Sequence, residues 1–191
     1  LFATGLRNPV GLAYEPTTKR LWTTVNERDG LGETVPPDYL TEVIDGAFYG
    51  WPYTYFGTYP DPTQMRLNPE ETKKALTNSR VPNLAIDAHS VPLGLLFHSG
   101  INIDDRYKNG AFVARRGGVS RSELTGYDLL FIPFENGYPT GVIEAFMTGF
   151  IADQSKAEIY GRPVGLAEMN DGSILLSDDV AGRIWRIGKS D

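Results

Sequence analysis

The pentapeptide Pro9-Val10-Gly11-Leu12-Ala13 recurs unchanged as Pro163-Val164-Gly165-Leu166-Ala167, and a weaker copy, Pro92-Leu93-Gly94-Leu95-Leu96, stands between them. Each copy is followed by a turn and a second apolar run. After the last copy, for example, Asn170-Asp171-Gly172 precedes the run at residues 173–177. An Asp-Gly turn between two apolar runs is typical of a β-hairpin. The repeat therefore predicts three antiparallel units of one kind.

A third apolar run follows each pair, at residues 39–44, 127–132 and 183–187, and the middle unit has a fourth at 142–146. Repeated four-stranded antiparallel sheets are the pattern of a β-propeller. We expect an all-β domain of about three four-stranded blades, approximately 1–62, 63–146 and 147–191.

Three blades form only a partial ring, because propellers have roughly four to eight. We therefore expect missing N-terminal blades on the same precursor, or a partner chain that completes the ring. The three copies begin 83 and 71 residues apart, whereas a bare blade needs only about 40–50 residues. The excess predicts insertions, at residues 52–83 and 117–126.

Composition excludes several classes of protein. The 18 basic and 24 acidic residues give a net charge of −6, which argues against nucleic acid or an anionic membrane as partner. The lack of cysteine excludes disulfides, thiolate nucleophiles and cysteine metal sites. No apolar run approaches the roughly 20 residues that cross a bilayer. The chain opens at Leu1 with no signal peptide, so we expect a processed product or a fragment.

Histidine and arginine supply the candidate site residues. His89 precedes the middle copy, at the entrance to an innermost strand. It is either a ligand-facing residue or a loop histidine satisfied by a backbone carbonyl. His98 is predicted to be a hairpin residue. Arg7 and Arg162 precede the first and last copies, and we interpret them as occupying the same phase of the repeat. Two guanidinium groups at one end of a channel would favour an anionic ligand or cofactor.

Two further segments have a functional and a structural interpretation. Residues 26–32 form an acidic, glycine-containing loop that could offer oxygen ligands to a hard cation such as calcium. Phe48-Tyr49-Gly50-Trp51-Pro52 could stack against a sugar ring, or could pack as core or as a latch between blades. Six other acidic residues are expected to be solvated in loops: Glu33, Asp38, Asp104, Asp105, Asp178 and Asp179.

Together these motifs resemble one protein family. Arg7-Asn8-Pro9-Val10-Gly11-Leu12-Ala13, then Asn26-Glu27, then Tyr49-Gly50-Trp51-Pro52, and later Gly126-Tyr127 and Gly161-Arg162-Pro163, are similar in order to the C-terminal half of the glucose/sorbosone dehydrogenase family. The sorbosone dehydrogenase-like branch matches best. The resemblance extends over essentially the whole chain.

The resemblance implies a six-bladed propeller, periplasmic or secreted, that binds pyrroloquinoline quinone (PQQ) and calcium. Such enzymes oxidise a sugar at C1, with a histidine as general base and hydride transfer to the quinone, and pass electrons to an external acceptor. The implied function is therefore the cofactor-binding portion of a PQQ-dependent aldose- or sorbosone-type sugar dehydrogenase. Its implied partners are a small-molecule sugar and that acceptor.

The resemblance also assigns residues by position. Cofactor contacts fall on Arg7, Asn8, Arg28, His89, Arg121 and Arg162. Calcium ligands, as backbone carbonyls, fall on Asp29 and Gly30. The catalytic histidine of the family lies before this segment, so we expect no sugar turnover by the isolated chain.

Two alternatives remain open. A calcium-dependent propeller lactonase or hydrolase would use Asn26 and Glu27 as ligands. A non-catalytic propeller that binds carbohydrate or protein would need no general base at all.

Overall fold

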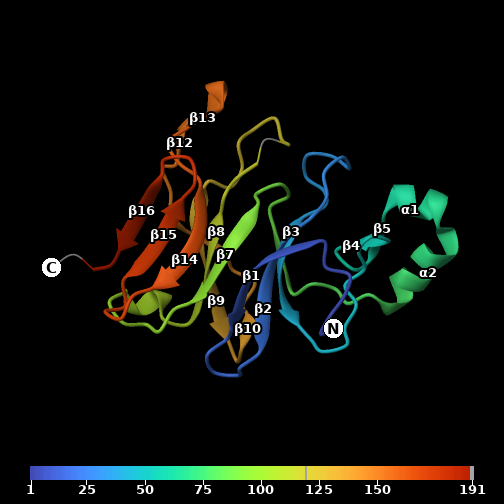
Figure 1. Ribbon diagram of the computed structural model, residues 1–191, viewed down its shortest axis with the longest axis horizontal. Helices are drawn as coiled ribbons and strands as arrows, with labels where there is room; N and C mark the ends of the chain where they lie inside the picture. The colour runs from blue at the N-terminus through green and yellow to red at the C-terminus, as the bar shows by residue number, and fades with distance from the viewer. Residues whose placement is uncertain (119, 190–191) are drawn as a thin grey trace.

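Three antiparallel sheets stand side by side in chain order in the computed structural model, which describes residues 1–118 and 120–189 (Figure 1). The first sheet is ordered β1 (Asn8–Tyr14), β2 (Leu21–Asn26), β3 (Asp38–Val43), β6 (Leu84–Ile86). The second contains β7 (Pro92–Phe97), β8 (Gly110–Arg115), β9 (Asp128–Glu135) and β11 (Glu144–Met147). The third contains β14 (Pro163–Glu168), β15 (Ile174–Asp178) and β16 (Arg183–Ile187).

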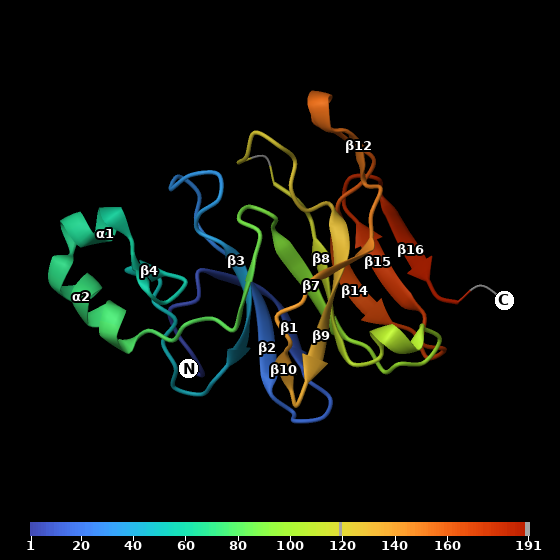
Figure 2. The ribbon, with the colours of Figure 1, turned by 180° about the vertical axis from the view of Figure 1, so that it is seen from behind.

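The remaining elements are short and lie in insertions. Between β3 and β6 come β4 (Thr54–Tyr55), β5 (Tyr59–Pro60), α1 (Pro62–Leu67) and α2 (Pro69–Asn78), which project from one side of the array (Figure 2). Elsewhere lie β10 (Tyr138–Pro139), β12 (Ile151–Asp153), β13 (Glu158–Ile159) and two 3-10 turns at Asp105–Tyr107 and Gln154–Lys156. Asp61 starts α1 by accepting the backbone N–H groups of Thr63 and Gln64, a regular N-cap.

The predicted fold class is confirmed, and two details differ from the expected blade pattern. The first sheet takes its fourth strand, β6, from beyond the insertion, so it extends past the expected boundary at residue 62. The third sheet has three strands in the described ranges, where four were expected. The insertion explains the first difference, because it separates β3 from β6 without interrupting their pairing.

The repeated pentapeptide forms the first strand of each sheet and carries the same irregularity each time. The pairing of this strand with the second one shifts by one residue within the motif, as a β-bulge does. The shifts fall between Pro9 and Leu12, Pro92 and Leu95, and Pro163 and Leu166. The sequence repeat is therefore a repeat of backbone geometry.

The glycine of the motif lets neighbouring sheets approach closely. A Cβ atom on Gly11 would lie 2.4 Å from the carbonyl oxygen of Leu93, and one on Gly94 would lie 2.5 Å from that of Val164. Thr24 joins the first contact: its hydroxyl accepts the N–H of Gly11 at 2.9 Å and donates to the Leu93 carbonyl at 2.8 Å. Strands β1, β7 and β14 are thereby held together as the innermost strands.

Two hydrophobic layers fill the spaces between the sheets. The layer between the first and second sheets contains Trp22, Leu40, Ile86, Leu95, Ala111, Val113, Leu130 and Ile132. The layer between the second and third contains Ile103, Phe112, Ala114, Tyr127, Leu129, Phe131, Phe150, Ile174 and Leu176. Trp22 is fully buried, with its ring edge-on to Phe134 at 5.0 Å. Burial of these layers is the main stabilising contribution, so each sheet depends on its neighbour.

Close packing at Gly94 predicts a position-specific cost. Gly94→Ala should lower the free energy of unfolding of the chain by about 1–3 kcal/mol, because the new methyl group meets backbone atoms that cannot move independently. Urea unfolding followed by circular dichroism measures this loss.

Gly165→Ala is the matched control, at the same position of the motif. A Cβ there would meet only the Ser177 hydroxyl, at 3.0 Å, which accepts the N–H of Gly165 within the same sheet, and no backbone atom of a neighbouring sheet. An equal loss of stability in both variants would contradict the close approach of β7 and β14.

Candidate functional site

The predicted site residues gather at one end of the three sheets. Strands β1, β7 and β14 begin at this end, and β2, β8 and β15 finish there, because each pair is antiparallel (Figure 1). We call it the loop end. It comprises residues 5–8, 27–37, 87–91, 116–118, 120–127, 160–162 and 179–182. All eight residues assigned by the resemblance lie in these segments.

Arg7 is fixed against the end of β2. Its Nη1 donates to the backbone carbonyl of Glu27 at 2.6 Å and to that of Asn26 at 3.3 Å, and its guanidinium lies 5.8 Å from the Trp51 ring centre. The side chain stays partly exposed. Asn8 follows as the first residue of β1, exposed and opposite Asn26 in register. Arg7 is thus an ordered cation whose hydrogen bonds use neutral acceptors.

Two buried carboxyl groups lie behind this arginine. Glu27 is 6% exposed, and burial, opposed by the N–H of Arg28 and the charge of Arg7, raises its pKa to about 7. Asp38 is 2% exposed and accepts the backbone N–H groups of Glu27 at 2.9 Å and Val91 at 3.0 Å. Burial also raises the pKa of Asp38. The expectation that Asp38 is a solvated loop acid is wrong, because it joins the first sheet to the second.

His89 links the 27–37 loop to the entrance of β7. It is buried, with Nε2 2.8 Å from the carbonyl oxygen of Gly32 and Nδ1 3.0 Å from Oδ1 of Asp29. The backbone here is unusual, since His89 and Val91 have φ of +60° and +56°. A positive φ is energetically costly for a β-branched residue such as Val91. Backbone strain of this kind concentrates at functional sites. The contact with the Gly32 carbonyl matches the other interpretation of His89, a loop histidine whose ring is satisfied by a backbone carbonyl.

Arg28 and Arg121 each donate a hydrogen bond to a neighbour of this histidine. Arg28 forms an ion pair with Asp61, the N-cap of α1, and its Nε donates to the Asp29 carbonyl at 3.1 Å. Arg121 reaches the carbonyl of Ala88, with Nη1 at 3.4 Å. Both arginines therefore tie loops of different segments together.

Asp29 and Gly30, the candidate calcium ligands, are exposed in the same loop. Within the described ranges, no group of three or more histidine, cysteine or acidic side chains is placed to hold a metal ion. A cation at Asp29 and Gly30 would therefore rely on backbone carbonyl oxygens, which calcium accepts as ligands.

Arg162 shares a carboxylate with Arg116, which is not among the predicted site residues. Asp179 accepts Nε of Arg162 at 2.8 Å through one oxygen and Nε of Arg116 at 2.7 Å through the other. The trio joins the second and third sheets and carries one net positive charge. Arg116 follows β8 directly, as Asn26 ends β2 and Asp179 follows β15. This shared position, at the end of the second strand of each sheet, is the sequence signal that could have identified Arg116.

The interpretation that Arg7 and Arg162 share one phase of the repeat is wrong. Pro9 and Pro163 occupy the same place in the two registers, so Arg162 corresponds to Asn8 and not to Arg7. The two arginines nevertheless lie at the same end of their strands, Arg7 directly before β1 and Arg162 directly before β14.

The structure also shows the surroundings of Asp178, of His98 and of the aromatic segment at residues 48–52. Asp178 is buried rather than solvated, and accepts the backbone N–H groups of Arg162 at 2.9 Å and Ala181 at 3.0 Å. His98 follows β7 as expected: its Nε2 is 2.7 Å from the Gly172 carbonyl and its Nδ1 accepts the N–H of Gly100, so both ring nitrogens bond to backbone groups. Tyr49 is buried, and its hydroxyl donates to the carbonyl of Glu42 in β3 of the first sheet at 2.5 Å, so this part of the aromatic segment packs as core.

One buried acceptor next to the loop end, at the last residue of β2, has no partner among the described residues. The side-chain oxygen Oδ1 of Asn26 is inaccessible and receives no hydrogen bond, while Nδ2 of the same amide lies 3.3 Å from the Pro92 carbonyl. An unpaired buried acceptor is costly, and a bound water or ion is one way in which such an atom is satisfied.

No helix in the described ranges is long and apolar enough to cross a membrane.

Comparison with known proteins places this geometry in a family. The model of the TrAA12-like family matches residues 1–190. An uncharacterized protein of Borreliella burgdorferi is 31% identical over 190 residues, which are 98% of this chain and 48% of that protein.

Solved structures with the same fold are more distant in sequence. The iodide structure of the Trichoderma reesei family AA12 enzyme is 23% identical, with a TM-score of 0.79 over 98% of this chain and 54% of that one. The holo pyranose dehydrogenase PQQ domain of Coprinopsis cinerea is 20% identical, with 0.74 over 98% and 55%. The PQQ-bound aldose sugar dehydrogenase of Streptomyces coelicolor is 19% identical, with 0.61 over 100% and 42%. The chain spans about half the length of these relatives.

The buried Glu27 predicts a pH dependence of stability. Its pKa is about 7 in the folded chain against 4.5 when unfolded, so between these values the folded state binds more protons than the unfolded state. The free energy of unfolding should therefore fall as the pH rises from 4.5 to 7 and then level off. Glu27→Gln removes this pH dependence. Across that interval, the free energy of unfolding of Glu27→Gln should therefore rise by roughly 3 kcal/mol relative to that of the parent chain.

Urea unfolding at several pH values, in the presence of EDTA, measures the difference. Glu33→Gln, an exposed change on the same loop, is the control and should follow the parent profile over the same interval. Parallel profiles for Glu27→Gln and the parent chain would show that Glu27 titrates normally.

Proposed function

Because this chain belongs to the TrAA12-like family, we propose that it is the cofactor-binding portion of a PQQ-dependent sugar oxidoreductase of the aldose or sorbosone type. The observation that carries the proposal is the set of arginines at the loop end of an acidic chain: Arg7, Arg28, Arg116, Arg121 and Arg162. Two structural relatives are described as a PQQ domain and as PQQ-bound, which supports the choice of cofactor.

The residues present fit the chemistry of PQQ. The cofactor carries three carboxylates, and guanidinium groups pair with carboxylates through two parallel hydrogen bonds. Arg7 and the Arg116–Asp179–Arg162 trio each offer net positive charge. The unpaired oxygen of Asn26 can accept the pyrrole N–H of the cofactor or serve as an oxygen ligand of calcium.

In this proposal each named residue either contacts the cofactor or calcium or holds a loop in position. Arg7 and Arg162 would hold cofactor carboxylates, and Asn8, Arg28 and Arg121 would line the same space. His89 would keep the 27–37 loop against β7. Asp29 and Gly30 would give carbonyl oxygens to calcium. Bound PQQ would supply the oxidising group, which takes up the hydride from C1 of the sugar and passes electrons to an external acceptor.

The proton acceptor for this reaction is not assigned to this chain. His98 is occupied structurally, and His89 bonds to a carbonyl and a carboxylate. We propose that the general base belongs to the part of the relatives' length that this chain does not span. The 191 residues alone should then bind cofactor without oxidising sugar. A periplasmic or secreted location accords with this cofactor chemistry.

Replacement of Arg7 or Arg162 tests the proposal. Arg7→Ala and Arg162→Ala should each weaken PQQ binding by about 10- to 100-fold, because each removes a charge-assisted hydrogen bond. Fluorescence titration with PQQ and calcium measures this in the longest polypeptide that the gene encodes.

The control variant is Arg106→Ala. Arg106 is an exposed arginine that pairs with Glu144 and lies away from the loop end. It should bind PQQ as the parent does. Unchanged affinity in both loop-end variants would reject the assignment of the site.

A calcium-dependent lactonase or hydrolase is the second candidate. The unpaired Asn26 oxygen and the buried Glu27 beside it favour this alternative, because amide and carboxyl oxygens bind hard cations. Lactone hydrolysis that requires calcium and not PQQ would select it over the dehydrogenase.

A further inference from the structure

Asp61 joins the insertion to the loop end, because its two carboxylate oxygens serve different segments. Oδ1 accepts the backbone N–H groups of Thr63 at 2.9 Å and Gln64 at 3.0 Å, which caps α1. Oδ2 forms the ion pair with Nη1 of Arg28 at the loop end. The backbone N–H of Asp61 also donates to the Tyr53 carbonyl at 2.9 Å. One residue therefore fixes both the start of a helix and an arginine of the loop end.

Asp61 and Arg28 depend on each other electrostatically. The Asp61 side chain is 3% exposed and that of Arg28 is 25% exposed, so neither charge is fully hydrated. Among the residues that the structure describes, Asp61 has no other ion-pair partner. A buried carboxylate that loses its cation is strongly destabilising. The guanidinium therefore cannot turn away without leaving the charge of Asp61 uncompensated.

Two of the three nitrogens of the Arg28 guanidinium are occupied by the protein. Nη1 is taken by Asp61, and Nε donates to the Asp29 carbonyl at 3.1 Å. Nη2 has no hydrogen-bond partner within the described ranges. It borders Gly30, since a Cβ atom on that glycine would lie 3.7 Å from it. Because the guanidinium is planar and rigid, the two occupied nitrogens set the direction of the third.

The ion pair also balances the charge of Arg28. Arg7, in contrast, donates to the neutral carbonyl groups of Asn26 and Glu27, so its positive charge remains available to a carboxylate. The charge of Arg28 is compensated by Asp61. Nη2 of Arg28 is therefore a hydrogen-bond donor on a neutral pair, and it suits an uncharged oxygen atom better than an anion.

We infer that Asp61 is a positioning residue for the cofactor site. It holds the Arg28 guanidinium in one orientation, with Nη2 as the donor, and it cancels the charge that would otherwise direct Arg28 to a carboxylate. Arg7 then binds an anionic group of the cofactor, and Arg28 binds an uncharged carbonyl oxygen. The identity of the ligand as PQQ rests on the proposed function, whereas the orientation of Arg28 does not.

The variant Asp61→Ser separates the two roles of the carboxylate. Serine is as effective a helix N-cap as aspartate, but its single, short oxygen cannot also pair with Arg28. Nitrogen-15 NMR of the arginine side chains, in the longest polypeptide that the gene encodes, follows the result. Arg28→Gln assigns the Arg28 signals by their loss. The two Nη groups should give separate signals in the parent, because Asp61 hinders rotation of the guanidinium, and should average in Asp61→Ser. Averaged signals in the parent, or separate signals in Asp61→Ser, would overturn the inference.

PQQ affinity tests the link to the cofactor in the same polypeptide. Arg28→Gln should weaken PQQ binding about 10-fold in the parent. In the Asp61→Ser background the loss should be less than about 2-fold, because residues in contact are not additive. Fluorescence titration at a fixed calcium concentration measures both losses. An equal loss in the two backgrounds would overturn the inference. A parent that binds no PQQ would reject the proposed function and the ligand assigned to Arg28, while the NMR comparison would still decide its orientation.

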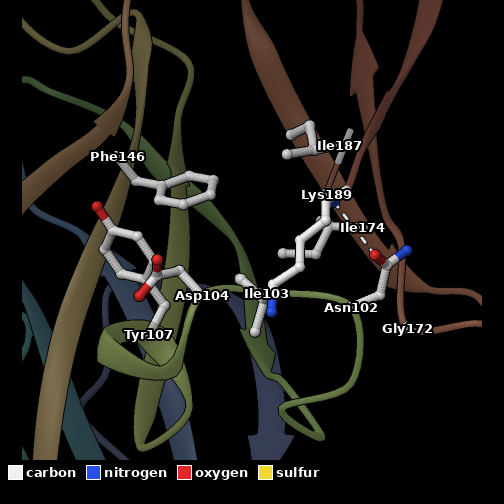
Figure 3. A pocket seen from close by; sticks show the side chains of 10 residues that line it. Asn102, Ile103, Asp104, Tyr107, Phe146, Gly172, Ile174, Ile187 and Lys189 are labelled. Atoms are coloured by element: carbon white, nitrogen blue, oxygen red, sulfur yellow. Dashed lines mark hydrogen bonds between the residues drawn. The ribbon is translucent and has the colours of Figure 1, made fainter. Parts of the chain in front are cut away.

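The control background is Asp104→Ser. Asp104 also caps a turn, by accepting the N–H of Arg106 at 3.1 Å. It lies between β7 and β8, at the end of the sheets opposite the loop end, and borders a hollow of about 180 Å³ beside Tyr107 (Figure 3). Arg28→Gln should weaken PQQ binding as much in this background as in the parent. A reduced loss here too would show that removal of any capping carboxylate suffices, and would overturn the specific role of Asp61.

Discussion

The close approach of β1, β7 and β14 is the constraint on which the rest of this structure depends. It exists because Gly11 and Gly94 place no side chain where the carbonyl groups of Leu93 and Val164 must lie. The bulge in each of these strands falls at the same motif, so the three strands keep a common orientation. Loops that are far apart in sequence consequently meet at one end of the sheets.

Convergence of the loops makes polar links between sheets possible. Asp38 at the start of β3 accepts the N–H of Val91 at the start of β7, and Asp179 after β15 holds Arg116 after β8. Each link buries or half-buries a charged group, which is favourable only when hydrogen bonds compensate for lost hydration. Arg116 is therefore held in place by a neighbour from another sheet, and Arg7 by the end of β2 in its own sheet, which favours a site whose geometry is set before a ligand arrives.

The strands and the loop end could be predicted from the sequence, because both follow from a repeat that is visible in the chain. The burial of Asp38 could not, because its partner Val91 is distant in sequence and nothing local to Asp38 signals it. The phase of Arg7 was misread because Arg7 stands two residues before Pro9, whereas Arg162 stands one residue before Pro163. Arg116 was missed because its partner Asp179 belongs to a different sheet. For Asp38 and Arg116, the missing information was a contact between sheets.

Apolar side chains on the two outer faces of the array are covered to different extents. Tyr39 points away from the second sheet, yet it is 1% exposed, because Phe56 of the insertion packs edge-on against its ring at 6.0 Å. The same sheet leaves Leu12 and Tyr14 of β1 exposed at 65% and 66%. At the other side of the array Ile184 is exposed and two hollows border its strand. Since each repeated unit of such a fold is stabilised mainly by its neighbours, β1 and β16 leave apolar residues without a covering neighbour among the described residues, whereas the insertion covers Tyr39 of β3.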